Sequence, residues 1–191
     1  MARDSAAREG GKPLRLFVAV EVPDAVLAVV EAALAEMRER HPGGRWVPRQ
    51  NQHVTVKFLG TTWPRLVDGV ERAVEYVARS TPRFSTRVEG LGAFPSQRRA
   101  RVLWAGLDDA QDRLADVAGA LDRALEREFP PEKRAFTPHL TIARFDPPIQ
   151  LEALPTVASD PFHVERLVLF RSHLRRPAPV YESVAAFPVG G

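Results

Sequence analysis

Two patterns of hydrophobic and polar positions divide the chain into predicted strands and helices. Short runs rich in β-branched, aromatic and other apolar residues, bounded by Gly, Pro or Asp, predict strands. Apolar residues three and four positions apart predict helices. The strands are expected at 14–22, 52–59, 84–90, 100–107, 138–144, 162–170 and 180–187, the helices at 24–40, 64–77 and 109–129, and loops at 46–51, 92–99 and 146–155.

The order of these elements predicts the fold class. Strands and helices neither alternate strictly nor segregate, which favours an α+β sheet structure over a doubly wound one. No Gly-rich phosphate loop opens a predicted helix, so neither a P-loop nor a dinucleotide-binding fold is expected. The length of 191 residues suits a single domain over 14–191, preceded by a polar tail, 1–13, that we expect to be flexible.

Composition narrows the functional classes. The chain has no Cys, which excludes disulfides, thiolate metal sites and a Cys nucleophile. No apolar run approaches the roughly 18 residues of a membrane span, and the N-terminus lacks the apolar stretch of a signal peptide. A cytoplasmic protein without a membrane partner is therefore expected. Arg greatly outnumbers Lys, and Arg suits phosphate binding, although a GC-rich genome would produce the same bias.

One short motif occurs twice. His53-Val54-Thr55-Val56 and His139-Leu140-Thr141-Ile142 share the order His, apolar, Thr, apolar, and each falls in a predicted strand. Side chains two apart in a strand face the same side, so each His should share a face with its Thr while the apolar pair enters the core. A single copy of such a motif is usually structural, whereas two copies in matched strands favour a functional pair.

Two imidazoles and two hydroxyls are the groups that metal-free opening of a cyclic phosphodiester requires. One imidazole activates water and the other protonates the departing sugar oxygen, and the pKa of imidazole near roughly 6.5 allows either role. Each Thr hydroxyl can donate a hydrogen bond to a non-bridging phosphate oxygen. We expect no metal and no cofactor.

These segments resemble the 2H phosphoesterases, and more narrowly the bacterial and archaeal RNA 2′,3′-cyclic phosphodiesterases, also called 2′-5′ RNA ligases. The resemblance rests on both His-Thr motifs and extends to three further segments, at 15–20, 101–106 and 167–172, in the family's order. It covers nearly all of residues 14–187.

The resemblance implies a bilobal α+β fold, with two pseudo-symmetric lobes of mainly antiparallel sheet and outer helices around a central cleft. It implies that His53 protonates the leaving 3′ oxygen and His139 activates water, which yields a 2′-phosphomonoester. It further implies that Thr55 and Thr141 bind the phosphate and that the reverse 2′-5′ joining of RNA occurs weakly. The expected partner is RNA with a 2′,3′-cyclic phosphate or a 2′-5′ linkage, tRNA fragments among the candidates, and the protein is expected to be a monomer.

Two arginines are further candidates for substrate binding. Arg144 follows the second motif, where the family often has Arg, but strand alternation turns it away from the His face unless the strand ends or bulges there. Arg101 belongs to an Arg cluster beside a Gly- and Pro-containing loop and could contact RNA phosphates. For two aromatic residues that could stack on bases, Trp46 and Phe94, packing is the preferred interpretation.

Three other functions remain open. A metal hydrolase would use His, but the chain lacks closely spaced ligand motifs such as H-x-H. A non-catalytic RNA-binding module would account for the Arg-rich loops but not for two His-Thr pairs. A cyclic phosphodiesterase acting on a small cyclic nucleotide or an ADP-ribose cyclic phosphate would use the same chemistry on another substrate.

Overall fold

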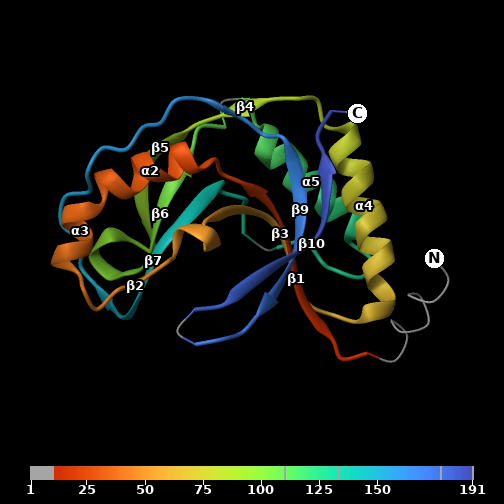
Figure 1. Ribbon diagram of the computed structural model, residues 1–191, viewed down its shortest axis with the longest axis horizontal. Coiled ribbons are helices and arrows are strands. Elements are labelled where there is room, and N and C mark those ends of the chain that lie inside the picture. Colours follow the sequence, from red (N-terminus) through yellow and green to blue (C-terminus); the bar gives the residue numbers. More distant parts are fainter. Residues whose placement is uncertain (1–10, 110, 133, 177, 191) are drawn as a thin grey trace.

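An antiparallel sheet of eight strands forms the centre of the protein (Figure 1). The computed structural model describes residues 11–109, 111–132, 134–176 and 178–190. The strand order is β10-β9-β1-β3-β7-β6-β5, with β2 beside β7, and a separate pair is formed by β4 and β8. The strands are β1 (Leu14–Glu21), β2 (Arg45–Trp46), β3 (His53–Thr62), β4 (Ser85–Thr86), β5 (Val88–Phe94), β6 (Ala100–Leu107), β7 (His139–Ile149), β8 (Phe162–His163), β9 (Arg166–His173) and β10 (Val180–Pro188).

Four helices lie in the described ranges, and some of them pack against the half of the sheet that they do not follow. They are α2 (Asp24–Ala33), α3 (Ala35–Arg40), α4 (Val67–Ser80) and α5 (Arg113–Leu125), with short 3₁₀ turns at η1 (Arg49–Asn51), η2 (Pro64–Leu66) and η3 (Gln97–Arg99). Helix α5 follows β6 but packs against β3, where the buried Lys57 ammonium donates to the Asp122 carboxylate. Helices α2 and α3 follow β1 but reach β7, because Leu34 and Arg38 line one small pocket with Ile142. This exchange ties the lobes together and confirms the bilobal α+β expectation.

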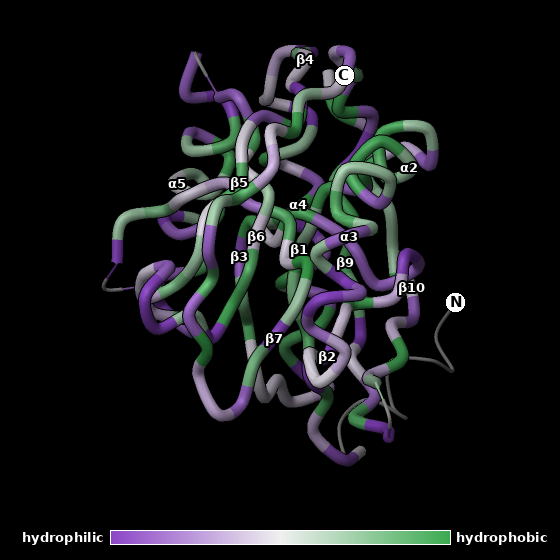
Figure 2. The backbone as a smooth tube through the Cα atoms, turned by 90° about the vertical axis from the view of Figure 1, so that its left-hand side faces the viewer, coloured by the Kyte–Doolittle hydropathy of each residue, from purple (hydrophilic) through white to green (hydrophobic). Residues whose placement is uncertain are grey.

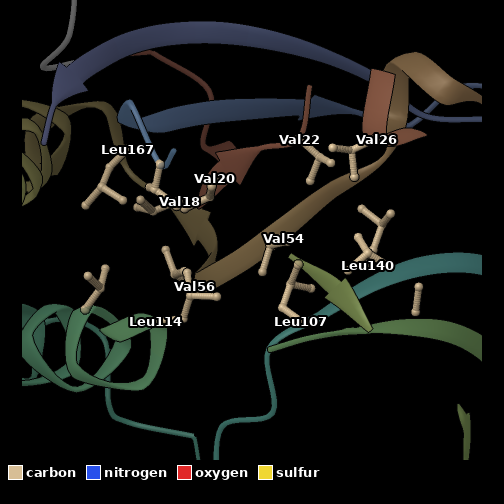
Figure 3. Close-up of a cluster of buried hydrophobic side chains, with 14 of the residues drawn as sticks. Val18, Val20, Val22, Val26, Val54, Val56, Leu107, Leu114, Leu140 and Leu167 are labelled. Atoms are coloured by element: carbon tan, nitrogen blue, oxygen red, sulfur yellow. The ribbon is translucent and has the colours of Figure 1, made fainter. Parts of the chain in front are cut away.

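The core lies between the sheet and these helices. Figure 3 shows Val54 of β3 near Leu140 of β7, with Val56 and Leu114 in the same cluster. Val54 is 1% exposed and Leu140 is fully buried. In Figure 2 the hydrophobic colour concentrates on the central strands, as expected for strands that bury one face.

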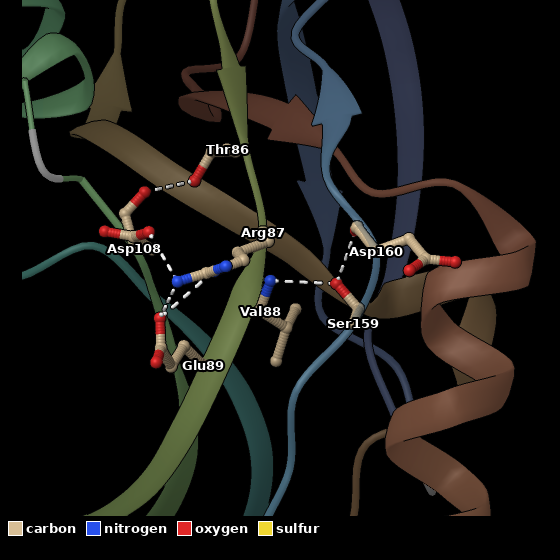
Figure 4. Close-up of polar contacts among 7 residues, drawn as sticks. All are labelled: Thr86, Arg87, Val88, Glu89, Asp108, Ser159 and Asp160. Carbon is tan, nitrogen blue, oxygen red and sulfur yellow. Dashed lines mark hydrogen bonds and ion pairs between the residues drawn. The ribbon is translucent and has the colours of Figure 1, made fainter.

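A polar cluster closes the end of the sheet where β5 and β6 meet the segment before β8 (Figure 4). The Arg87 guanidinium lies 2.9 Å from Glu89 and 3.3 Å from Asp108. The backbone N–H of Val88 donates to the Ser159 hydroxyl at 3.0 Å. These contacts fix the start of β5 against the end of β6, next to the pair Gly106↔His139 that joins β6 to the second motif strand.

Several boundaries differ from the sequence-based expectation, and hydrogen bonds account for two of them. The helix expected at 24–40 is interrupted at Leu34, between α2 and α3. Helix α5 begins at Arg113 rather than Asp109, because the Asp109 carboxylate accepts hydrogen bonds from the N–H groups of Leu114 and Ala115 and so caps the helix. Strand β7 continues to Ile149 through part of the expected loop, because β6 pairs with it as far as Ala100↔Ile149.

None of the helices in the described ranges is long and apolar enough to cross a membrane. Of the expected N-terminal tail, residues 1–10 lie outside the described residues.

Candidate active site

The two motif strands meet at a single residue pair. Strands β3 and β7 run antiparallel, and Val54 pairs with Leu140. Both side chains enter the core, so their sequence neighbours, the two motif His and the two motif Thr, are on the opposite face. These four residues are partly exposed and line one cleft with a volume of about 550 Å³. The structure therefore brings together the residues that the repeated motif singled out.

A β-bulge in β7 turns Arg144 toward this cleft. The adjacent residues Leu103 and Trp104 of β6 pair with residues of β7 that are two apart, so that Ile142 is the extra residue. Ile142 and its successor are both buried, which reverses the alternation. Arg144 is consequently exposed and lines the cleft, as sequence reasoning predicted for the case of a bulge.

Strand β3 carries the same irregularity at the equivalent position. Adjacent residues Val18 and Ala19 of β1 pair with Lys57 and Thr55, which leaves Val56 as the extra residue. Phe58 thereby faces the cleft and is 42% exposed. The two lobes thus share both the motif and the bulge, with Phe58 in one lobe corresponding to Arg144 in the other.

His53 lies in an aromatic setting that disfavours its charged form. Its ring stacks on Phe17 with centroids 4.7 Å apart, and the Tyr181 ring meets it edge-on at 5.2 Å. Burial lowers the pKa of His53 from 6.5 to about 4; a hydrogen bond with the Asn51 backbone raises the pKa, and the nearby charge of His139 lowers it. In the free protein at neutral pH, His53 is therefore neutral.

His139 has a tautomer fixed by the backbone. Its Nδ1 lies 2.7 Å from the carbonyl oxygen of Thr137, and because a carbonyl only accepts, Nδ1–H is the donor. The lone pair of the neutral ring is then on Nε2, the atom a general base needs. The Phe94 ring lies edge-on to this imidazole at 5.4 Å, and Trp104 lies at 6.2 Å.

The rim of the cleft is positively charged. Among the described residues that line it are Arg15, Arg45 and Arg144, but neither Asp nor Glu. The Arg15 guanidinium lies over the Phe58 ring, 4.8 Å from its centroid. The positive charges of Arg144 and Arg15 also act on the Tyr181 hydroxyl, whose pKa burial raises and these two charges lower. The guanidinium groups of such a cleft can bind an anion, and its aromatic rings can stack on a planar base.

Other sequence candidates lie elsewhere or serve packing. Arg101 is not among the residues that line the cleft, and its guanidinium lies 3.4 Å from the Asp146 carboxylate. Phe94 stacks on Trp104 with centroids 5.2 Å apart. Trp46 lines the cleft, while its indole N–H donates to the His41 carbonyl at 3.1 Å.

Sequence reasoning missed several residues that line the cleft, among them Arg15, Phe17, Arg45, Phe58 and Tyr181. Alternation along the strand at 14–22 could have placed Arg15 and Phe17 on one face. It could not have shown that this face lies next to His53. No local sequence pattern marks Tyr181 as a site residue, because it reaches the site from the hairpin of β9 and β10. That hairpin is fixed by the Asn51 side chain, which donates to the Pro179 carbonyl at 2.7 Å.

Within the described ranges, no group of three or more His, Asp or Glu side chains is placed to hold a metal ion. The arrangement can instead supply two imidazoles, two hydroxyls and several guanidinium groups to one bound anion. These groups suit acid–base chemistry on a phosphate.

Comparison with known proteins shows which family this chain is similar to. A family model described as the 2′-5′ RNA ligase superfamily matches residues 22–176. An RNA 2′,3′-cyclic phosphodiesterase of Aquifex aeolicus is 30% identical over 189 residues, covering 94% of this chain and 100% of the relative. One from Geobacillus stearothermophilus is 30% identical over 180 residues, covering 92% of this chain but 57% of that longer protein.

Solved structures agree on the fold. The protein TT0787 of Thermus thermophilus superposes with a TM-score of 0.81 at 29% identity, covering 93% of this chain and 99% of that one. Escherichia coli LigT in its apo form gives a TM-score of 0.77 at 22% identity, covering 95% and 100% of the two chains.

Proposed function

This chain belongs to the 2′-5′ RNA ligase superfamily, and on that basis we propose that it is an RNA 2′,3′-cyclic phosphodiesterase that forms 2′-phosphomonoesters by two-histidine catalysis. Relatives of that name, matched over most of this chain, support the enzyme class. One observation carries the mechanism: the two strands that meet at Val54 and Leu140 present both His-Thr pairs to one cleft.

In this mechanism the cyclic phosphate lies between the two imidazoles. His139 Nε2 accepts a proton from water, and the water oxygen forms a bond to phosphorus. The bond from phosphorus to the 3′ oxygen breaks, and His53 donates its proton to that oxygen. The product keeps its phosphate on the 2′ oxygen. Thr55 and Thr141 donate hydrogen bonds to the non-bridging oxygens, where negative charge increases.

Because its pKa is low, His53 is neutral in the free protein and must gain a proton before it can act as the acid. The bound phosphate is itself the opposite charge that raises the pKa of a neighbouring imidazole. His53 accordingly takes up its proton when the substrate binds. The exposed cleft allows this uptake, and the anion then keeps the imidazolium in place until the 3′ oxygen departs.

The same proposed mechanism would also allow a weak joining of RNA ends. A 5′ hydroxyl in place of water would lose its proton to His139 and attack the cyclic phosphate, and His53 would again protonate the 3′ oxygen. A 2′-5′ linkage results. Arg144, and by the sequence argument Arg101, remain proposed contacts to the phosphate or the RNA backbone. The tRNA fragments, the monomeric state and the cytoplasmic location stay predictions.

The proposal is tested with a short RNA ending in a 2′,3′-cyclic phosphate, in the presence of EDTA. We expect a 2′-phosphate product, and losses on the order of 100-fold or more in His53→Ala and His139→Ala. His163→Ala, which removes an exposed imidazole of β8 outside the cleft, is the matched control and should keep full activity. Loss of turnover with EDTA would overturn the metal-free mechanism, and RNA binding without hydrolysis would favour a binding module. Faster turnover of a small cyclic nucleotide or an ADP-ribose cyclic phosphate would move the assignment to that substrate class.

A further inference from the structure

The buried side chain of Asn51 joins two parts of the cleft that are distant in the sequence. Asn51 ends the 3₁₀ turn η1, two residues before His53, and is 7% exposed. Its amide group donates to the carbonyl of Pro179, 128 residues further along the chain, at 2.7 Å. A buried amide that lost this partner would have no water to replace it, so breaking the hydrogen bond is costly. The bond therefore holds the connection between β9 and β10 against the turn that leads into the first motif strand.

This connection forms one wall of the cleft. Leu174, Ala178 and Pro179 all line the cleft. Among the described residues of the connection, 174–176, 178 and 179, Pro179 is the one whose hydrogen bond reaches a residue outside the hairpin. The position of this wall consequently depends on Asn51.

The same hairpin covers the imidazole of His53. Tyr181 follows Pro179 by two residues, and its ring meets the imidazole edge-on at 5.2 Å and the Phe17 ring edge-on at 5.1 Å. Tyr181 thereby contributes to the burial of His53. The backbone of Asn51 also forms a hydrogen bond with this imidazole. Asn51 thus contacts His53 through its backbone, and through its side chain it holds the hairpin that covers His53.

The second lobe has only the backbone half of this arrangement. Thr137 occupies the equivalent position, two residues before His139, and its carbonyl accepts a hydrogen bond from the His139 ring at 2.7 Å. The side chain of Thr137 is exposed, however, and its hydroxyl has no hydrogen-bond partner among the described residues. The side-chain contact to a distant hairpin is therefore a feature of the lobe that carries the proposed acid.

We infer that Asn51 is a positioning residue for the acid His53, because its side chain holds the β9–β10 hairpin where Tyr181 covers the imidazole. This inference rests on the proposed function and deepens it, since it states how the acid is kept in place before the substrate binds. An imidazole that must protonate the 3′ oxygen has to stay aligned with it, and small displacements of a catalytic group reduce the rate strongly.

Asn51→Ala removes the amide and leaves the backbone contact possible. In an NMR titration, the midpoint of the His53 imidazole should rise from about 4 toward 6.5, because a released hairpin lets water reach the ring. With an RNA 2′,3′-cyclic phosphate as substrate, kcat/KM should fall about tenfold or more. Gln50→Ala, which removes an exposed carboxamide of the same 3₁₀ turn outside the cleft, should change neither quantity.

A double variant tests whether Asn51 acts through the hairpin. Tyr181→Leu should by itself raise the His53 midpoint, and adding Asn51→Ala should raise it little further, because both changes remove the same cover. A midpoint that stays near 4 in Asn51→Ala, or two shifts that add, would overturn the role of Asn51. If Asn51→Ala does not fold, an unchanged midpoint in Tyr181→Leu overturns it instead. These titrations need no turnover, so a wild type that hydrolyses no cyclic phosphate would contradict the proposed function and not the positioning of His53.

Discussion

The ring of Phe17 lies face to face with the imidazole of His53, with the ring planes 25° apart. This apolar contact keeps water from one face of the imidazole, and such burial is the main cause of the lowered pKa of His53. His139 has no comparable stacked partner among the described residues, and its ring meets aromatic neighbours at steep angles. The two motif histidines are therefore equivalent in backbone position but different in environment.

Binding of a phosphate should raise the pKa of His53. In the free protein this pKa is about 4, and a phosphate between the two histidines places negative charge beside the ring. The measurement is an NMR titration of the His53 imidazole with and without a nucleoside 2′-monophosphate, the product of the proposed reaction. The His163 signals, from a residue outside the cleft, serve as the internal control. A His53 titration midpoint that stays near 4 with ligand bound would exclude the acid role proposed for this residue.

The same pKa makes the fold sensitive to acid. The pKa of His53 is lowered from 6.5 to about 4 on folding, so between these values the unfolded chain binds more protons than the native protein. Above pH 6.5 this difference has no effect on the free energy of unfolding. As the pH falls from 6.5 toward 4, the free energy of unfolding decreases, by at most about 3 kcal/mol.

Urea unfolding of the wild type and His53→Gln at pH 7 and pH 4.5 measures this contribution. The wild type should lose more stability than the variant, because every other group titrates alike in both proteins. His163→Gln, a change at an exposed imidazole, should lose as much as the wild type. Equal losses in the wild type and in His53→Gln would show that His53 is not buried as a neutral group.

Strand alternation alone predicted the central part of the site. It placed His53 with Thr55 and His139 with Thr141, because both pairs precede the bulges. It could not settle Arg144 or reveal Phe58, because each depends on an extra residue that only pairing with a neighbouring strand exposes.

Long-range contacts account for the remainder. Tyr181 reaches His53 only because β10 pairs with β9 and β9 with β1, and no local pattern reports such an order. Lys57, directly after the first motif, is a charged residue that serves the core: it is 3% exposed and its ammonium lies 2.5 Å from Asp122 of α5. Its structural role depends on the packing of a helix that is distant in the sequence.

Two adjacent glycines provide a matched test of how β2 is placed. A Cβ at Gly44 would lie 2.6 Å from the Phe145 ring, whereas one at Gly43 would meet nothing within 4 Å. Gly44→Ala should push β2 away from β7 and cost about 1–3 kcal/mol, as overpacking does. Gly43→Ala should be close to neutral, and chemical unfolding of both variants gives the comparison. Equal stability of the two would mean that β2 moves freely and does not fix Arg45.

The motif threonines should contribute through their hydroxyls alone. Thr55 and Thr141 line the same cleft as the two histidines, and Val has nearly the same shape as Thr without the hydrogen-bond donor. A hydrogen bond to a charged group contributes about 1.5–3 kcal/mol, so Thr55→Val and Thr141→Val should each lower kcat/KM by about 10- to 100-fold. Thr→Ser at either position should restore much of the rate, because the hydroxyl returns. Thr61→Val, at an exposed position of the same strand as Thr55, should leave kcat/KM unchanged. If the Val variants keep full activity, the phosphate is held by the histidines and arginines, and the threonines only complete the strand.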